Sequence, residues 1–383
     1  MKILIASGVP RMREAGTAGL VLQQAEELRK LGHVVDCWFY GDVIEKRRWP
    51  ARFSDLEFAY KVSGRIRRNP TQYDVVNLLA PWGCAYGLSR KLFPSAALPP
   101  YVFTMQGSEA RYALVMCAEN RKGRATNFRW KNRVWHRLYH QTLYDISISS
   151  ADYGTVACRE GWTHSELKYR FQPGRIWFVP NGVGRQFFQP RTFLDGVATR
   201  LLFVGTWLDR KGIYYLVDAS AQLGPRIADL TLTVVGCMVD EQQIRAFFPT
   251  DLRARVSVIP LVSREAMPGI YATHDILVLP SLIEGMPLTL LEAMAAGMPV
   301  VTTNTCGMAD VVEDGFNGLL VPPANAAELA SAIKRLCESP ELRKKLGTTA
   351  QETARRYTWD VIACQLERIF KLAVRPAQCD TGL

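Results

Sequence analysis

Two glutamates, Glu284 and Glu292, stand eight positions apart in a segment whose pattern predicts a strand, a tight loop and a helix. The apolar run Ile276–Leu279 before them is typical of a buried parallel strand. Gly285 permits a sharp turn, and Pro287 suits the first position of a helix. We therefore expect Glu284 in the loop and Glu292 inside the helix.

This arrangement predicts a nucleotide site, because the free N–H groups of a helix N-terminus attract phosphate. At about 1.5 Å of rise per residue, Glu292 would lie roughly 7–8 Å along the helix from its tip. A carboxylate there could accept hydrogen bonds from the hydroxyls of a ribose attached to that phosphate. Taken alone, however, Glu284 could be a turn residue and Glu292 a solvated residue of a helix face.

The whole segment from Pro280 to Val301 closely resembles the signature of the retaining glycosyltransferase family 4, whose members have the two-domain GT-B fold. Further matches include Val179–Val183, Thr305–Gly315 and Asn317–Pro323, so that the specific resemblance covers about residues 179–335. It implies transfer of a sugar from a UDP- or GDP-sugar to an acceptor hydroxyl, with retention of the anomeric configuration. The basic, tryptophan-containing first half of the chain suggests that the acceptor is a lipid-linked or growing polysaccharide or another glycoconjugate.

The resemblance also implies roles for particular residues. Glu292 would contact the ribose, Glu284 the donor sugar, and the backbone of Gly285, Met286, Pro287 and Leu288 phosphate or sugar. Retaining members are thought to react on one face of the sugar, with the leaving phosphate helping to deprotonate the acceptor, so no dedicated nucleophile is expected. Since the chain has no Asp-x-Asp motif, we expect a metal-independent reaction without cofactors, in which positive side chains and helix dipoles replace the ion.

A second phosphate-binding segment is expected at Gly205–Gly212, which follows one predicted strand and precedes a helix. Arg210 and Lys211 would bind the diphosphate and stabilise charge on the departing nucleotide, which makes them, with Glu284, the candidate catalytic residues. Members of the family usually have arginine where this chain has Thr206, and Arg210 could supply the missing charge. The alternative is a solvated pair of basic loop residues.

Two loops of the first half complete the candidate donor site. Gly16 and Thr17 open a helix in a segment that resembles the family's Gly-Gly loop, with Ala15 in place of the first glycine. Gln106 stands where many relatives have a histidine that contacts the transferred sugar. Because a side-chain amide does not take up a proton at neutral pH, Gln106 is a candidate for sugar contact but not for a general base.

Short apolar runs alternate with amphipathic stretches throughout the chain, which predicts an α/β fold with two Rossmann-like domains and parallel sheets. We expect an acceptor domain over residues 1–185 and a nucleotide-sugar domain over residues 186–357. The resemblance implies that the two sheets face a central cleft and that a last helix, within residues 358–383, returns to the first domain. The predicted strands are Ile3–Ala6, Val34–Tyr40, Val75–Leu79, Tyr101–Thr104, Asp152–Ala157, Ile176–Val179, Leu201–Val204, Leu232–Val235, Val256–Ile259, Ile276–Leu279 and Val300–Thr302.

The positive charge is concentrated in the first half of the chain. Residues 1–190 have 28 Lys and Arg against 15 Asp and Glu, a net +13, whereas the remainder has 19 against 21, a net −2. Basic residues alternate with tryptophan and phenylalanine in residues 47–53 and 121–140, a composition that suits an anionic membrane surface. The alternative is a solvated helix whose aromatic side chains pack on the domain.

The remaining composition indicates a cytoplasmic protein, with contact to the inner face of the membrane as a further expectation. The chain has nine scattered cysteines without a Cys-x-x-Cys pair, which argues against a zinc site, and no apolar run of about 18 residues. Two other functions stay open at this point. A GT-B sugar-nucleotide epimerase would bind the same donor, and a non-enzymatic nucleic-acid binder is favoured only by a pI of about 9.3. We expect no nucleic-acid partner.

Overall fold

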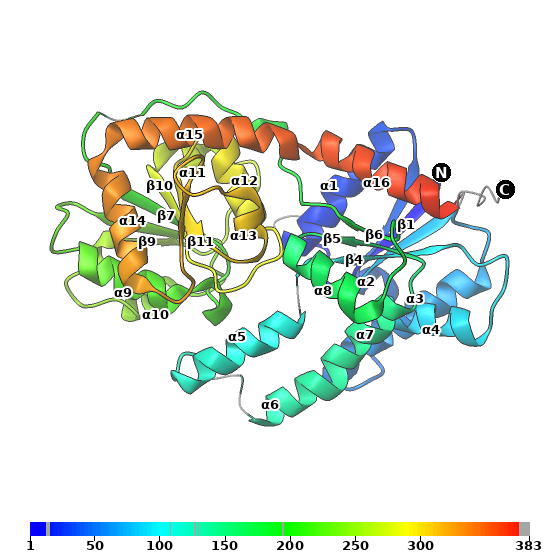
Figure 1. The fold of residues 1–383 in the computed structure, drawn as a ribbon. Coiled ribbons are helices and arrows are strands. Elements are labelled where there is room, and N and C mark those ends of the chain that lie inside the picture. Colours follow the sequence, from blue (N-terminus) through cyan, green and yellow to red (C-terminus); the bar gives the residue numbers. More distant parts are fainter. Residues whose placement is uncertain (13–15, 108, 126–127, 129, 194, 375–383) are drawn as a thin grey trace. The chain divides into compact units, whose positions relative to one another are not determined.

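The computed structural model describes residues 1–12, 16–107, 109–125, 128, 130–193 and 195–374 (Figure 1). The chain divides into two compact units. Unit 1 consists of residues 1–113, 129–180 and 359–383, and unit 2 consists of residues 114–128 and 181–358. Each unit contains a six-stranded parallel sheet with helices packed against it, so the predicted α/β architecture is confirmed.

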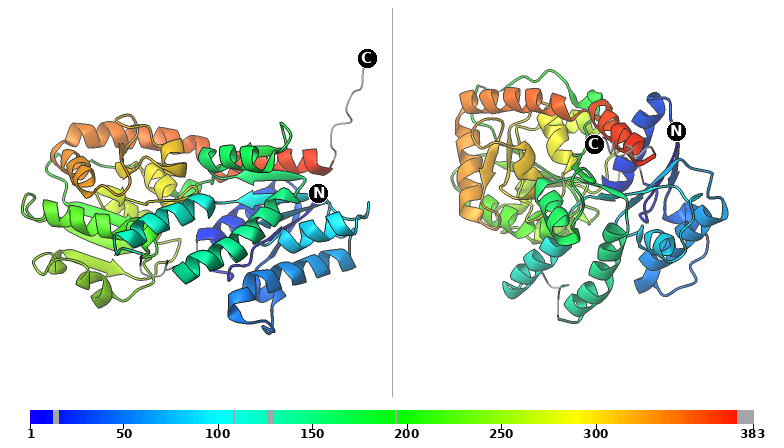
Figure 2. Two further views of the ribbon diagram at one scale, coloured as in Figure 1. Left: turned by 60° about the horizontal axis from the view of Figure 1, so that its bottom comes forward. Right: turned by 45° about the vertical axis from the view of Figure 1, so that its right-hand side comes forward.

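The sheet of unit 1 has the strand order β2-β1-β3-β4-β5-β6, and all pairs are parallel. Helix α16 packs with α1 and lies against β3 and β4, while α3 and α4 lie on the other side of the sheet (Figure 2). The strands are β1 (Lys2–Ala6), β2 (Val34–Trp38), β3 (Val75–Leu79), β4 (Tyr101–Met105), β5 (Tyr153–Val156) and β6 (Ile176–Phe178). The helices are α1 (Gly16–Lys30), α2 (Tyr40–Val43), α3 (Ser54–Arg68), α4 (Cys84–Leu92), α6 (Trp130–Trp135), α7 (Gln141–Ser149), α8 (Arg159–Tyr169) and α16 (Trp359–Val374).

The sheet of unit 2 has the order β12-β11-β10-β7-β8-β9 and is also parallel throughout. Its strands are β7 (Arg200–Val204), β8 (Thr231–Val235), β9 (Val256–Ile259), β10 (Ile276–Leu279), β11 (Val300–Thr303) and β12 (Leu319–Val321). Its helices are α9 (Ile213–Leu223), α10 (Glu241–Ala246), α11 (Met267–Thr273), α12 (Leu288–Ala295), α13 (Cys306–Val311), α14 (Ala326–Glu338) and α15 (Pro340–Ala354). Helix α12 packs with α15, and α9 packs with α14.

Most of the predicted strands are confirmed, and the differences have local causes. The strand expected over Val34–Tyr40 ends at Trp38, because the Asp42 carboxylate accepts a hydrogen bond from the backbone N–H of Phe39 and the chain turns into α2. Strand β12 was not among the predictions, since its three residues stand between Gly318 and Pro322 and give too short an apolar pattern.

Helix α5 (Glu109–Arg121) starts in unit 1, whereas residues from Leu114 to Phe128 belong to unit 2. Buried Glu119 anchors this segment by accepting a hydrogen bond of 2.9 Å from the hydroxyl group of Tyr215 in α9. Arg124 forms an ion pair of 2.8 Å with Asp218 of the same helix. Part of the basic stretch 121–140 is therefore neutralised by α9.

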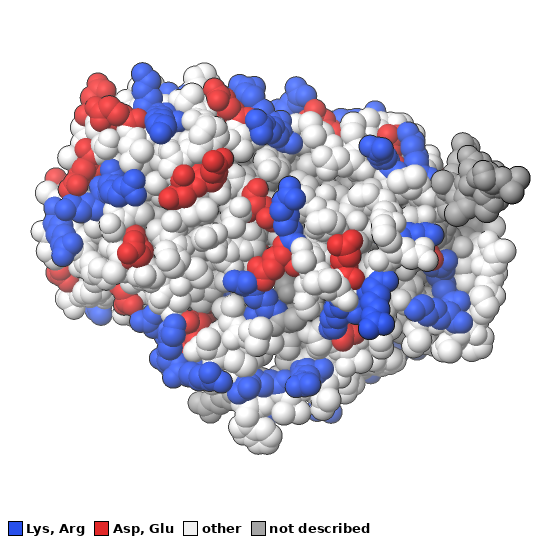
Figure 3. Space-filling view, viewed as in Figure 1, with Lys and Arg blue, Asp and Glu red and all other residues white. Residues whose placement is uncertain are grey.

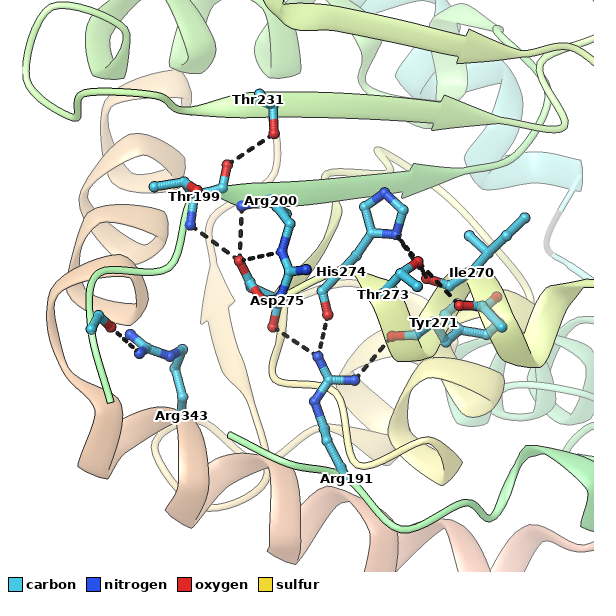
Figure 4. A network of polar contacts seen from close by, with 12 residues as sticks. Arg191, Thr199, Arg200, Thr231, Ile270, Tyr271, Thr273, His274, Asp275 and Arg343 are labelled. Atoms are coloured by element: carbon cyan, nitrogen blue, oxygen red, sulfur yellow. Dashed lines mark hydrogen bonds and ion pairs between the residues drawn. The ribbon is translucent and has the colours of Figure 1, made fainter. Parts of the chain in front are cut away.

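A polar network fixes β7 and β10 at their amino ends (Figure 4). The Asp275 carboxylate accepts hydrogen bonds from the backbone N–H groups of Thr199 and Arg200 and from the Arg200 guanidinium, at 2.6–3.2 Å. Burial opposes ionisation, but the hydrogen bonds from Arg200 lower the pKa of Asp275 below its ordinary value. Arg191 donates to the carbonyl groups of Tyr271 and His274 in the same network. The register of the two strands is thereby set at the edge opposite their carboxyl ends.

Candidate functional site

Two loops of unit 2 pack together where β7 and β10 end. Because the strands are parallel neighbours, their carboxyl ends meet at one edge of the sheet. The backbone N–H of Leu282 donates to the carbonyl of Arg210 at 2.8 Å. Gly212 has φ +73°, and a Cβ at this position would lie 1.9 Å from the carbonyl oxygen of Pro280. Only glycine fits such an approach, so the sequence itself brings the two loops into backbone contact.

Glu284 lies between two cations at this junction. Its Oε1 atom is 2.5 Å from Lys211 Nζ and 3.0 Å from Arg210 Nη1. Burial favours the neutral acid, but the charges of Lys211 and Arg210 outweigh it and lower the pKa of Glu284 below its ordinary value. The site therefore holds an ionised carboxylate with two cations.

The loop between Glu284 and α12 is held from two sides. Asn181 donates a hydrogen bond of 2.7 Å from its side-chain amide to the carbonyl of Met286. Gly307, in α13, lies so close that a Cβ there would stand 1.8 Å from the Gly285 carbonyl oxygen. Pro287 has an extended backbone at the N-cap, and α12 begins one residue later, at Leu288. The N–H groups at the start of α12 are thus presented by a firmly supported loop.

Glu292 belongs to a separate polar cluster, one turn farther along α12. Its Oε2 atom accepts a hydrogen bond of 3.0 Å from the Tyr271 hydroxyl group, and its Oε1 atom lies 3.7 Å from Arg264 Nη2. Burial raises the pKa of Glu292 to about 7, although Arg264 and the Tyr271 hydrogen bond favour the carboxylate. Glu292 is therefore buried, and the alternative that it is a solvated residue of a helix face is wrong.

Three buried polar atoms near Glu292 have no hydrogen-bond partner among the described residues. They are Nε and Nη2 of Arg264 and Oγ1 of Thr289. A buried donor without a partner is costly, so these atoms mark a place where a polar ligand would gain hydrogen bonds. Arg264, Tyr271, Thr289 and the hydrogen bond of Asn181 to Met286 were not predicted from the sequence. Arg264 had one available signal, since it follows β9 at the same carboxyl edge as the two loops.

Two of the other candidate residues lie in loops that follow strands, and two lie at the start of a helix. Half-buried Thr206 lies in the loop after β7. In unit 1, Gly16 and Thr17 form the start of α1, and half-buried Gln106 follows β4 directly. Ala15 lies outside the described residues. Within unit 2 the structure thus brings Arg210, Lys211 and Glu284 into one cluster and gives Glu292 different partners.

No His, Cys, Asp and Glu side chains of the described ranges gather in a group of three or more that could bind a metal ion. In the same ranges, every helix is too short or too polar to cross a membrane.

The amino-acid sequence of unit 2 is similar to that of known enzymes. Residues 185–353 match the family described as "Glycosyl transferases group 1". The chain is 31% identical over 198 residues to a phosphatidyl-myo-inositol mannosyltransferase of Mycobacterium leprae, an alignment that covers 50% of this chain and 52% of that protein. The chain spans about half the length of most of the curated relatives it matches.

Two solved structures share the fold over almost the whole chain. Sucrose-phosphate synthase from Thermosynechococcus elongatus superposes with a TM-score of 0.76 at 21% identity, covering 97% of this chain and 98% of that one. Anabaena Alr3699/HepE, solved in complex with UDP, superposes with a TM-score of 0.68 at 17% identity, covering 97% and 100%. At these identities the likeness concerns the fold alone, and it confirms the GT-B class expected from the sequence.

Proposed function

We propose that the protein transfers a sugar from a nucleotide-sugar donor to an acceptor hydroxyl, because its residues 185–353 belong to the glycosyl transferases group 1 family. The observation that carries this proposal is the pairing of Lys211 and Arg210 with Glu284 beside the start of α12. Two cations and a helix N-terminus suit a diphosphate, and a carboxylate next to them suits the hydroxyls of the attached sugar.

The donor would extend from this cluster along α12. Lys211, Arg210 and the backbone N–H groups of Gly285, Met286 and Leu288 would bind the diphosphate, while Pro287, which has no N–H, would contribute only backbone contact. Glu292 would accept hydrogen bonds from the ribose hydroxyls, and Nε and Nη2 of Arg264, which form no hydrogen bond with a described residue, would donate to acceptor atoms of the nucleoside beside it. Gly16, Thr17, Gln106 and Thr206 are further candidates for donor contact.

The chemical step would depend on charge. As the bond between the sugar and the diphosphate breaks, negative charge develops on the leaving phosphate, and fixed cations stabilise it. Lys211 is the principal candidate because its side chain is only 11% exposed, so that solvent screens its charge weakly. We infer that the reaction retains the anomeric configuration, that the leaving phosphate accepts the acceptor's proton and that no metal ion takes part.

Thermal unfolding with UDP, GDP, ADP and TDP and with their common sugars tests the donor site. A ligand at about 100 times its Kd should add about 2.7 kcal/mol to the unfolding free energy. We expect one nucleotide to stabilise the native protein and the Glu292→Ala variant to lose that effect. The UDP bound to the Anabaena structure makes UDP the first candidate. If no nucleotide stabilises the protein, the proposed donor is wrong, and turnover without an acceptor would indicate an epimerase.

For the acceptor, we propose a lipid-linked or growing polysaccharide at an anionic membrane surface. Helix α6 continues through the π-helical turn His136–His140 into α7, and its outer side carries an apolar stripe. Trp130, Val134 and Leu138 recur every four residues and are 68%, 49% and 70% exposed. Lys131, Arg133 and Arg137 alternate with this stripe in the sequence, and Figure 3 shows Lys and Arg side chains along the lower edge of the face that it draws. Exposed apolar groups between basic ones suit the interface of a membrane with anionic lipid.

The opposite side of the same helix packs on unit 1. Trp135 and Tyr139 stack at 4.7 Å between ring centroids, and both contact Phe53 edge to face. The hypothesis that aromatic side chains of this stretch pack on the domain is therefore correct for Trp135 and Tyr139, whereas Trp130 is exposed to solvent. The guanidinium of Arg52 lies 5.0 Å from the Phe53 ring, so part of the cluster 47–53 also packs on the domain.

Co-sedimentation with vesicles tests this surface. We expect binding to vesicles with anionic lipid at low salt, a loss of that binding at high salt, and little binding to neutral vesicles. The double variant Trp130→Ser, Leu138→Ser should bind at least about tenfold more weakly, because two interfacial apolar groups are removed. Leu167→Ser is a matched control, since Leu167 is 74% exposed on α8. Absence of binding to anionic vesicles at low salt would refute the proposal.

A further inference from the structure

The geometry points to a second role for Glu284, which rests on the proposed function. We propose that its carboxylate competes with the donor's diphosphate for Arg210 and Lys211, and that the exchange of partners releases the carboxylate to the hydroxyls of the donor sugar. Glu284 would then be a positioning residue that couples the binding of the diphosphate to recognition of the sugar.

The first observation is that all the contacts of Glu284 end on one oxygen atom. Oε1 lies 2.5 Å from Lys211 Nζ, 3.0 Å from Arg210 Nη1 and 3.5 Å from the donating hydroxyl of Ser281. No hydrogen bond from a described residue reaches Oε2. The carboxylate is thus oriented by the two cations, and half of its capacity to accept hydrogen bonds is unused.

The second observation is the burial of the cluster. The side chains of Glu284 and Lys211 are each 11% exposed, and that of Arg210 is 34% exposed. One carboxylate does not balance two cations, so the cluster has an excess of positive charge that solvent screens weakly. A diphosphate has more negative charge and more acceptor oxygens than a carboxylate. It should therefore displace Glu284 from at least one of the cations.

The displaced carboxylate must find new donors, because a buried charge without partners is strongly unfavourable. The hydroxyl groups of the donor sugar can supply them. A nucleoside diphosphate without the sugar cannot, and it would place its own charge close to the uncompensated carboxylate. The exchange consequently favours binding of the intact donor and weakens binding of the nucleotide that remains after transfer, which promotes product release.

Isothermal calorimetry on the native protein and on Glu284→Gln tests the exchange. The ligands are UDP with UDP-glucose, GDP with GDP-mannose, and pyrophosphate. The glutamine has the same shape but no charge to compete for the cations. We expect the variant to bind the nucleoside diphosphate and pyrophosphate about tenfold more tightly than the native protein does, since a competing anion is removed. We also expect it to lose the native preference for the sugar-bearing form.

A control and a second variant make the outcome decisive. Glu292→Gln is the matched control, because it removes the other carboxylate of this segment and should weaken both forms of the nucleotide alike. Glu284→Asp withdraws the carboxylate by one methylene group and should give an intermediate effect even if Glu284→Gln folds poorly. Equal or weaker binding of pyrophosphate and nucleoside diphosphate to both Glu284 variants would overturn the inference. Absence of any nucleotide binding to the native protein would instead refute the proposed donor, while the pyrophosphate titration would still decide the exchange.

Discussion

The protonation state of Glu292 should control the affinity for the nucleotide-sugar donor. Burial raises its pKa to about 7, so this carboxyl group changes its charge within the range from pH 6 to pH 8. The hydroxyl group of Tyr271 already donates to one of its oxygens at 3.0 Å. Ribose hydroxyls would donate to the same carboxylate, and hydrogen bonds of this kind favour the ionised form.

The magnitude follows from the fraction of ionised Glu292. With a pKa of about 7, roughly one molecule in ten is ionised at pH 6 and nine in ten at pH 8. If only the ionised form binds ribose, the apparent affinity rises about tenfold over this range, or about 1.4 kcal/mol. Raising the pH has the opposite effect on the free energy of unfolding. A carboxyl pKa raised from 4.5 to about 7 contributes stability below pH 4.5, and this contribution, about 3 kcal/mol at most, is lost as the pH rises through 7.

The assay is calorimetric titration with UDP-glucose, or with the donor identified by thermal unfolding, at pH 6, 7 and 8. A nucleotide sugar is preferable to the free diphosphate, because its phosphates do not change their charge in this range. The native protein should bind more tightly as the pH rises, and Glu292→Gln should bind weakly and independently of pH. The reasoning is refuted if native affinity is constant from pH 6 to pH 8, or if the variant shows the same pH dependence.

Three further predictions follow from particular contacts. Arg264→Met should weaken the binding of UMP and of UDP by the same factor, about tenfold or more, because the lost hydrogen bonds go to the nucleoside. Lys211→Met should weaken the binding of UDP more than that of UMP. Calorimetry with both ligands measures this, and an effect of Arg264→Met on UDP alone would contradict the prediction. Gly307→Ala should lower the affinity for the donor at least about tenfold, because the added Cβ would stand 1.8 Å from the Gly285 carbonyl oxygen. Gly269→Ala is the control, since a Cβ at Gly269 has no atom within 4 Å, and this variant should bind the donor normally. Asp275→Asn should lower the free energy of unfolding by about 2–4 kcal/mol at neutral pH. Since the pKa of Asp275 is lowered from 3.8, denaturation in urea should show this difference shrinking as the pH falls below that value, with donor affinity of the folded variant unchanged.

Local pattern alone predicted every described strand except β12, and the order in which the strands occur along the chain. Strands β3, β9 and β10 have the predicted bounds, because each mainly apolar run is preceded by a charged residue and followed within two residues by a proline. Helix α16 also begins and ends where its amphipathic pattern does. Gly212, with its positive φ, fixes a turn that no other residue type adopts easily. Residues such as Arg210, Lys211 and Glu284 could be assigned to loops after strands for the same local reasons.

Only the tertiary structure decided which of these side chains become partners. Loops that follow β7 and β10 meet because the two strands are neighbours in the sheet, a pairing between residues more than 70 positions apart that no local pattern encodes. The Tyr271 hydroxyl and the Arg264 guanidinium reach Glu292 from elements whose own patterns indicate nothing about α12. In the same way, Trp130 and Trp135 have similar sequence surroundings, but packing against Phe53 and Tyr139 half-buries Trp135, whereas Trp130 stays exposed. Sequence therefore determined the elements and the kinds of side chain at their ends, whereas long-range pairing and burial determined the charges, the partners and the exposed surface.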